Sequence, residues 1–130
     1  MVIDSSALLA GLLGEPGADR YLQAIDAAPS RKISAGSVLE LYLVLEDRLG
    51  GLGGDQLDLI LLEAEIKVIP LDREQASIAR RAFRRFGKGR HPARLNFGDC
   101  MSYALWKVTG EPLLFKGDGF TKTDVEPALV

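Results

Sequence analysis

The sequence predicts an α/β fold, in which helices cover both faces of a central, mainly parallel sheet. Short apolar runs that read as strands alternate with segments of helical apolar spacing along the 130 residues. Asp4 and Asp118 follow the first and the last of these runs, beyond the strand ends where open parallel sheets bind ligands. Because the chain has no repeat and no long linker, one domain spanning residues 1–130 is expected.

The first half is predicted to run strand, helix, helix, strand, helix, helix. Gly14-Glu15-Pro16 separates the first two helices, and Pro16 suits the first turn of the second. Gly50-Gly51 is expected to end the third helix. The predicted bounds are Met1–Ile3, a helix ending at Leu13, a helix ending before Pro29, Lys32–Ala35, about Ser37–Leu49 and about Asp55–Glu65.

The second half is predicted to run strand, helix, basic loop, helix, strand. In the first of these helices Ala76, Ala79, Phe83 and Phe86 are expected to be buried, with the arginines on the far side. Gly110 is expected to cap the last helix. The predicted bounds are Lys67–Leu71, Glu74–Phe86, a loop over Gly87–Arg94, Asn96–Thr109 and Leu113–Phe115.

Two predicted helices, Ser37–Leu49 and Asp55–Glu65, are too apolar for an ordinary surface position. Leucines and other apolar residues cover nearly their whole circumference. A helix that is apolar all round is buried all round. The pattern fits a deep core, but in a domain of this size it favours a partner chain or a self-interface.

Composition and charge limit the class of protein. The 47% hydrophobic and 26% charged fractions are typical of a soluble globular domain. A single cysteine excludes an internal disulfide and a cysteine-based zinc site. No secretory leader precedes Asp4 and no apolar run is long enough to span a membrane, so a cytoplasmic protein without membrane contact is expected.

The net charge of −2 conceals a basic block between Arg80 and Arg94, which contains His91 and no acid. A basic block opposite an acidic site suits a polyanionic substrate that is held by its phosphates and cut at a metal ion. A solvated helix face is the alternative. The residues expected to contact an RNA backbone are Arg84, Arg85, Lys88, Arg90 and His91.

Four acids, Asp4, Glu40, Asp99 and Asp118, form the candidate catalytic set. Clustered carboxylates repel one another unless they share a cation, so the set predicts a divalent metal site. Each acid also has a purely structural alternative: a helix cap for Asp4, a solvated helix edge for Glu40, a capping box with Asn96 for Asp99, and a turn for Asp118. Ser6 is expected to donate a hydrogen bond to a metal ligand or to a metal-bound water without binding the metal itself. The alternative is a hydrogen bond that starts a helix.

Other catalytic arrangements lack support. The chain has no Gly-x-Ser-x-Gly elbow and no phosphate-binding Gly-x-x-x-x-Gly-Lys loop. His91 is the only histidine and lies in the basic stretch, where contact with phosphate is expected rather than general-base catalysis. Cys100 and Trp106 fall in a helical apolar pattern and are expected in the core.

Several segments together resemble the PIN-domain ribonucleases and, within them, the VapC toxins of type II toxin–antitoxin pairs. The resemblance covers nearly the whole chain and is most specific in the Asn-Phe-Gly-Asp-Cys and Leu-Phe-Lys-Gly segments. The segments are Val2-Ile3-Asp4-Ser5-Ser6-Ala7-Leu8, Ser34-Ala35 leading to Glu40, Gly87-Lys88-Gly89-Arg90-His91, Leu95-Asn96-Phe97-Gly98-Asp99-Cys100 and Leu113-Leu114-Phe115-Lys116-Gly117-Asp118.

The resemblance implies a three-layer α/β/α sandwich and RNA cleavage that depends on Mg²⁺ or Mn²⁺. By position, Asp4 and Asp99 match the central metal ligands of the family, with Ser6 and Asn96 beside them. Glu40 and Asp118 match the two acids that complete the pocket directly or through waters. The family often has an acid before the Phe that follows the last strand; here Gly119 takes that position, which leaves Asp118 as the only acid in the turn.

The resemblance also implies partners. It implies a cognate antitoxin that covers the apolar helices and blocks the acidic pocket, a homodimer, and operator DNA that is bound only through the antitoxin.

Three other classes of protein are alternatives to this interpretation. A receiver-type phosphate switch would need a phospho-accepting Asp after the middle strand, where only Asp72 is available, with Lys116 as its lysine. A haloacid-dehalogenase-type phosphatase would need Asp-x-Asp where this chain has Asp4-Ser5-Ser6. The third rival is a catalytically idle binding module of the same fold, against which the intact set of four acids argues.

Overall fold

The computed structural model, which describes residues 1–129, has a four-stranded sheet with all neighbouring strands parallel. The strand order is β3-β2-β1-β4, and the central strand β1 is followed at once by Asp4. The strands are β1 (Val2–Ile3), β2 (Lys32–Ser34), β3 (Lys67–Ile69) and β4 (Leu113–Leu114). The sequence-based prediction of an α/β fold with a parallel sheet is confirmed.

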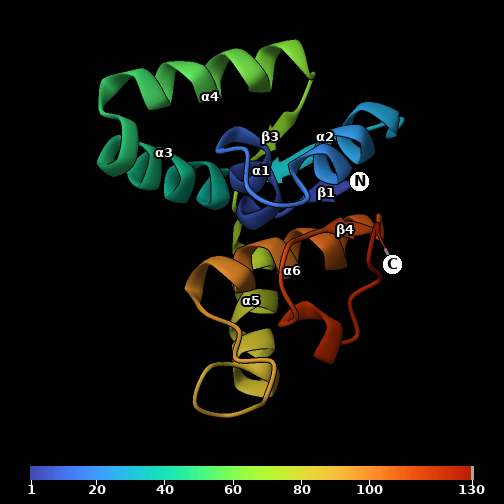
Figure 1. Cartoon of the computed structure of the whole chain (residues 1–130). Helices are drawn as coiled ribbons and strands as arrows, with labels where there is room; N and C mark the ends of the chain where they lie inside the picture. The colour runs from blue at the N-terminus through green and yellow to red at the C-terminus, as the bar shows by residue number, and fades with distance from the viewer. Residues whose placement is uncertain (130) are drawn as a thin grey trace.

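Six α-helices cover the two faces of this sheet (Figure 1). Successive side chains of a strand point to opposite faces, so Ile3 and Leu114 join the core beneath α1–α4, whereas Val2 and Leu113 join the core beneath α5 and α6. The result is the expected three-layer sandwich. The helices are α1 (Ser5–Leu12), α2 (Ala18–Ala27), α3 (Ala35–Leu49), α4 (Gly51–Glu63), α5 (Arg73–Phe86) and α6 (Phe97–Thr109).

Three local predictions need correction. Helix α2 begins after Gly17, so Pro16 lies in the preceding turn and not in the first helical turn. Helix α4 begins at Gly51 rather than near Asp55. Gly53 lies inside this helix and permits close packing on α3, because a Cβ there would lie 2.8 Å from the carbonyl oxygen of Leu45.

The buried stripe of α5 was predicted correctly at Phe86 and in part at Ala79, but wrongly at Ala76 and Phe83. Ala76 and Phe83 are exposed, whereas Gln75 and Ala82 are buried together with Phe86. Packing against α6 selects this side of the helix. As a result, Phe83 remains on the surface beside the arginines.

The hairpin of α3 and α4 leaves apolar surface uncovered, as the sequence indicated. It forms the upper part of the molecule in Figure 1. Leu43 of α3 is 62% exposed, and Leu52 and Leu62 of α4 are 70% and 76% exposed. Large apolar side chains this exposed are available for contact with a partner. Among the described residues, no helix has the length and hydropathy needed to cross a membrane.

Candidate active site

Three of the four predicted acids line one pocket at the carboxyl end of the central strand. Asp4 comes from the end of β1, Glu40 from the second turn of α3 and Asp99 from the first turn of α6. The pocket has a volume of about 270 Å³, and Ser5, Ser6 and Asn96 also line it. Residues 95 positions apart are thus brought together by the parallel topology, as the sequence predicted.

Asp4 is the most firmly held of the three. Its side chain is buried, although it also caps α1 through the Ser6 backbone N–H at 3.0 Å. The Ser6 hydroxyl donates to Asp4 Oδ2 at 2.5 Å and itself accepts a bond from the Lys116 backbone N–H at 3.0 Å. Ser6 therefore links Asp4 to the end of β4, in the supporting position that was predicted for it.

Ser102 completes the support of Asp4 and was missed by the sequence analysis. Its hydroxyl donates to Asp4 Oδ1 at 2.5 Å and lies 3.2 Å from the hydroxyl of Ser37 on α3. Both serines are fully buried. The available signal was that each is a small polar residue inside an otherwise apolar stretch of helix, where an unpaired hydroxyl is costly.

Glu40 is positioned by a hydrogen bond and by the absence of a side chain opposite it. The Ser5 hydroxyl donates to Glu40 Oε1 at 2.5 Å. The Cα of Gly98 faces the same carboxylate so closely that a Cβ would lie 2.3 Å from Glu40 Oε2. Glycine at position 98 thus creates the space that Glu40 occupies.

Asp99 lies at the N-terminus of α6 in a capping box with Asn96. The Asp99 backbone N–H donates to Asn96 Oδ1 at 2.9 Å, and the Asn96 backbone N–H donates to Asp99 Oδ2 at 3.0 Å. Burial raises the pKa of the Asp99 carboxyl to about 6; the bond from Asn96 opposes this rise, whereas the charges of Asp4 and Glu40 add to it. The capping box therefore also fixes the Asp99 carboxylate at the edge of the pocket.

Asp118 is not among the residues that line this pocket. Its side chain is 91% exposed and lies 4.0 Å from Lys122 Nζ. Gly117 has φ +103, a conformation that favours glycine, and the chain continues from it into a short 3₁₀ helix at Phe120–Lys122. The structure brings three of the predicted acids together and leaves the fourth on the surface.

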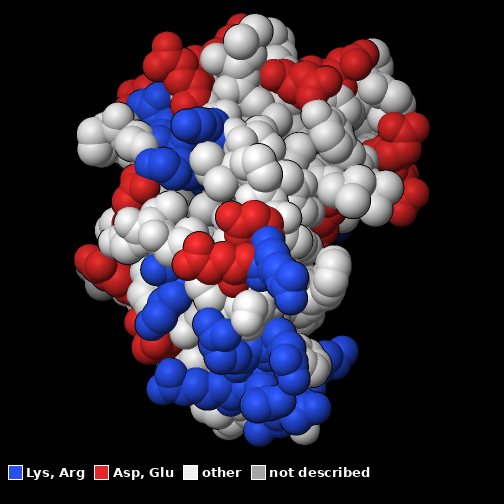
Figure 2. Space-filling model, turned by 180° about the vertical axis from the view of Figure 1, so that it is seen from behind, with Lys and Arg blue, Asp and Glu red and all other residues white. Residues whose placement is uncertain are grey.

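The predicted basic residues gather at one end of the molecule. Lys and Arg side chains cover the end of α5 and the loop that follows it, in the lower part of Figure 2. This loop returns to the acidic pocket, since Leu95 pairs with Gly87 just before Asn96 begins the cap of α6. The basic surface therefore begins next to the acids.

The predicted basic residues differ in exposure and in the contacts that they already make. Arg84, Lys88 and Arg90 are exposed, and the Arg90 guanidinium lies 5.4 Å from the centre of the Phe83 ring. His91 is partly used within its own loop, because its Nδ1 accepts the Ala93 backbone N–H at 3.0 Å and its ring meets Phe86 edge to face.

The donor set of the pocket fits a hard divalent cation. It offers carboxylate oxygens, which Mg²⁺ prefers, and it holds them in a partly buried place, where burial and, to a lesser degree, the charges of Asp4 and Glu40 raise the pKa of Asp99. Within residues 1–129, no three His, Cys, Asp or Glu side chains are close enough to bind one ion together. The fit is therefore to an ion that keeps waters and takes one or two carboxylates, as Mg²⁺ commonly does.

Comparison with known proteins gives the family. Residues 1–126 match the model of the PIN domain. Ribonuclease VapC of Mycolicibacterium smegmatis is 53% identical over 125 residues, which cover 96% of this chain and 97% of that protein. The chain belongs to the VapC group of the PIN-domain family.

Two solved structures of VapC and toxin–antitoxin proteins share the fold. VapC20 of Mycobacterium tuberculosis, a toxin that cleaves the sarcin–ricin loop, superposes with a TM-score of 0.73 at 20% identity, covering 97% of this chain and 98% of the other. A toxin–antitoxin complex from Klebsiella pneumoniae contains a chain with a TM-score of 0.71 at 15% identity, with coverage of 95% and 92%. Family membership argues against the receiver and dehalogenase alternatives. In agreement with this, Asp72 is the exposed cap of α5 beyond the edge strand β3.

Proposed function

We propose that this VapC-family chain is a Mg²⁺-dependent endoribonuclease and the toxin of a toxin–antitoxin pair. The observation that carries the proposal is the convergence of Asp4, Glu40 and Asp99, from three separate elements, on one pocket beside a basic surface. The pairing of acidic and basic surfaces suits a phosphodiester that is held by its charge and hydrolysed among carboxylates. The relative from M. smegmatis, 53% identical, is named a ribonuclease.

In this proposal Asp4 and Asp99 hold the ion. When bound, Mg²⁺ would lower the pKa of a water and offset negative charge on the phosphate oxygens, and Mn²⁺ would substitute for it. The hydroxyls of Ser6 and Ser102 fix the direction of the Asp4 carboxylate. Their loss would loosen the site without removing an acid.

Glu40 has a different part. One of its oxygens is engaged by Ser5, and the other lies over Gly98, facing the pocket. We assign Glu40 to orient the attacking water and accept its proton. Asp118 follows β4 and its side chain is exposed, so in this proposal it contacts only RNA or solvent and not the ion.

The raised pKa of Asp99 predicts how cation binding depends on pH. Because the folded state holds the Asp99 proton more tightly than a carboxyl at the ordinary pKa of 3.8, this group's contribution to stability falls as pH rises from about 4 to about 6. A cation needs the ionised form, so Mn²⁺ affinity should rise over the upper part of that range and level off above it.

Mn²⁺ binding followed by electron paramagnetic resonance between pH 5 and pH 8 checks this prediction. Alongside it, the contribution of Asp99 should lower the melting temperature of the cation-free protein as pH rises from about 4 to about 6. An Asp99→Asn protein should bind Mn²⁺ weakly. In it, Mn²⁺ affinity and melting temperature should both lose the pH dependence that is assigned to Asp99. Wild-type affinity that stays flat from pH 5 to pH 8 would contradict the assignment of Asp99 as a ligand.

We also propose that a cognate antitoxin covers the uncovered leucines of α3 and α4. A groove lined by Leu8, Leu12, Leu22 and Leu59 lies between α1, α2 and α4 next to them, with a volume of about 270 Å³. Its lining is mainly apolar, as a groove for an amphipathic helix requires. A homodimer, and operator DNA bound only through the antitoxin, belong to the same proposal.

Charge substitutions on this surface should separate antitoxin binding from catalysis. Leu59→Glu and Leu62→Glu should each weaken antitoxin binding by about tenfold or more, because a carboxylate would be buried in an apolar contact. Both leucines are exposed, so folding and RNA cleavage should stay at wild-type levels. Co-purification with the antitoxin and calorimetric titration measure the effect. Gln23→Glu, at an exposed position of α2 that does not line the groove, is the matched control for charge. Unchanged antitoxin affinity in both leucine variants would place the interface elsewhere.

A further inference from the structure

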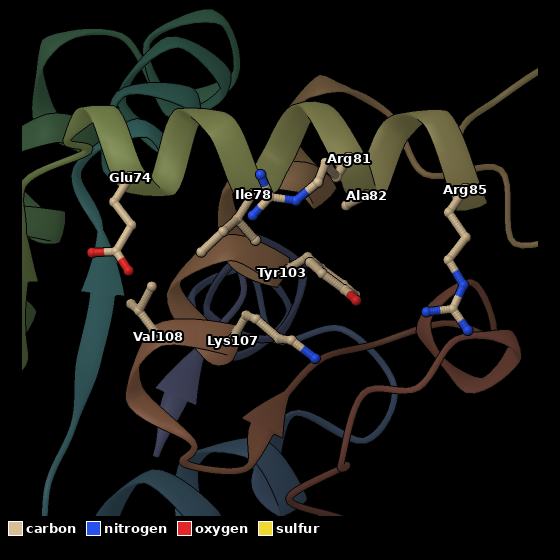
Figure 3. Close-up of a pocket in the computed structure, with 8 residues that line it drawn as sticks. All are labelled: Glu74, Ile78, Arg81, Ala82, Arg85, Tyr103, Lys107 and Val108. Carbon is tan, nitrogen blue, oxygen red and sulfur yellow. The ribbon is translucent and has the colours of Figure 1, made fainter.

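A second hollow lies between α5 and α6, on the α5 surface that carries the arginines. Its volume is about 600 Å³. Figure 3 shows Arg85 descending from α5 at one end of the hollow and Glu74 at the other, with Arg81 of α5 and Lys107 of α6 between them. We call it the α5/α6 groove, and its lining is Glu74, Ile78, Arg81, Ala82, Arg85, Tyr103, Lys107 and Val108.

The acidic pocket and the groove are both lined by residues of α6, Asp99 in the pocket and Tyr103 and Lys107 in the groove. Asp99, Tyr103 and Lys107 are spaced four residues apart, which places them on the same side of the helix. Eight residues of helix span about 12 Å. A strand with its scissile phosphate at the acids would reach Lys107 after roughly four stacked nucleotides.

The charges around the groove favour an anion. Three cations from two helices line it, against a single lining acid, Glu74, at the end far from Arg85. The Arg81 guanidinium donates one bond, to Ser77 Oγ on its own helix at 2.9 Å, and is otherwise free to bind. Arginine presents several N–H donors in a fixed plane that matches phosphate oxygens.

A carboxylate of the chain already approaches these cations. Asp124 Oδ2 lies 3.7 Å from Arg85 Nη1 and 3.8 Å from Lys107 Nζ, too far for hydrogen bonds. Its Oδ1 accepts the Tyr103 hydroxyl at 2.8 Å. Burial and this carboxylate raise the pKa of Tyr103, so the hydroxyl remains a donor. An anionic oxygen is therefore stabilised near Arg85 and Lys107, and the one that lies there belongs to Asp124, whose side chain is partly exposed.

We propose that the α5/α6 groove binds a backbone phosphate of the RNA, a few nucleotides from the cleaved bond, through Arg81, Arg85 and Lys107. The inference rests on the proposed function and adds a remote contact to it. Asp124 competes for Arg85 and Lys107, so it weakens binding and limits how long RNA is retained. RNA contacts in the α5/α6 groove should end before Glu74, because a second phosphate there would be repelled by its carboxylate.

The test measures RNA binding separately from cleavage. An Asp99→Asn background prevents turnover, and fluorescence anisotropy follows single-stranded oligouridine of about 4 and about 12 nucleotides. Adding Arg81→Gln and Lys107→Gln together should weaken binding of the longer RNA by about tenfold and leave the shorter one nearly unchanged. The slope of log affinity against log salt for the longer RNA should fall by up to about 0.7, the value for one lost phosphate contact.

Substitution of Asp124 should strengthen RNA binding, whereas substitution of Arg81 and Lys107 should weaken it. Asp124→Asn keeps an acceptor for the Tyr103 hydroxyl but removes the competing charge, so affinity for the longer RNA should rise several-fold. The matched control is the pair Arg20→Gln and Arg48→Gln, at two exposed arginines on α2 and α3. This pair should leave the affinity for both RNA lengths unchanged. Circular dichroism confirms that each protein is folded.

Three results would overturn the inference: equal losses for both lengths, no loss for the longer RNA, or weaker binding by Asp124→Asn. A loss of antitoxin binding without a loss of RNA binding would assign the groove to a protein partner and would also overturn it. Failure of the proposed function is distinguishable, because a wild-type chain that cleaves no RNA could still bind the longer oligonucleotide through the groove.

Discussion

Replacing Asp99 by Asn should abolish RNA cleavage while the protein stays folded. The substitution removes one of two proposed ligand charges from the pocket, and we expect kcat/KM to fall by at least about 10³-fold. Folding should survive, because an asparagine oxygen can still accept the Asn96 backbone N–H that closes the capping box. Above pH 6 the melting temperature without a cation should match or exceed that of the wild type, since repulsion with Asp4 and Glu40 is relieved.

Cleavage of a defined RNA and thermal unfolding, measured on the same preparations, check this prediction. Asp55→Asn, an exposed acid on α4, is the control for loss of one negative charge. Wild-type cleavage by a folded Asp99→Asn protein would remove Asp99 from the site. It would also leave the raised pKa as a feature of the helix cap alone.

Gly98→Ala should impair catalysis strongly with almost no cost in stability. The new methyl group would lie 2.3 Å from Glu40 Oε2, so the carboxylate must move. The end of a glutamate side chain moves easily, and alanine is preferred over glycine in a helix by about 1 kcal/mol, so the melting temperature should hold or rise. Misplacing a catalytic group by about 1 Å can cost about 10²-fold in rate, which is the loss we expect.

The cause of that loss can be isolated with a double substitution. In a Glu40→Gln background the further change Gly98→Ala should add little, because both act through the same carboxylate. Gly51→Ala, at the start of α4 with no neighbour within 4 Å of the new methyl group, is the matched control and should keep full activity. Full additivity of Glu40→Gln and Gly98→Ala would mean that Gly98 acts on something other than Glu40.

The main features of the fold and part of the site could be predicted from the sequence because they depend on local patterns. The apolar run before Asp4 and the cap at Asn96 mark the ends of elements, and parallel topology brings such ends together. The surplus of leucines on α3 and α4 was likewise visible, because a domain of this size has little room to bury two helices that are apolar on nearly all sides.

The remaining features depend on tertiary contacts that have no local signal. Ser102 reaches Asp4 across 98 positions, and a serine in the middle of an apolar helix does not indicate its partner. The buried side of α5 is chosen by contact with α6, because small apolar residues lie on more than one side of the helix. The turn at Gly117 directs Asp118 outward, which a list of acids after strands does not reveal.

The measurement that tests the central claim most directly is cleavage of a total-RNA pool by the purified, antitoxin-free chain. Wild type and Asp4→Asn are compared with Mg²⁺, with Mn²⁺ and with a chelator. The account predicts discrete products with wild type and either cation, and none with chelator or with Asp4→Asn. Intact RNA in every wild-type reaction, with the protein shown to be folded, would contradict it and favour a binding module that has kept the acids of the fold without the activity.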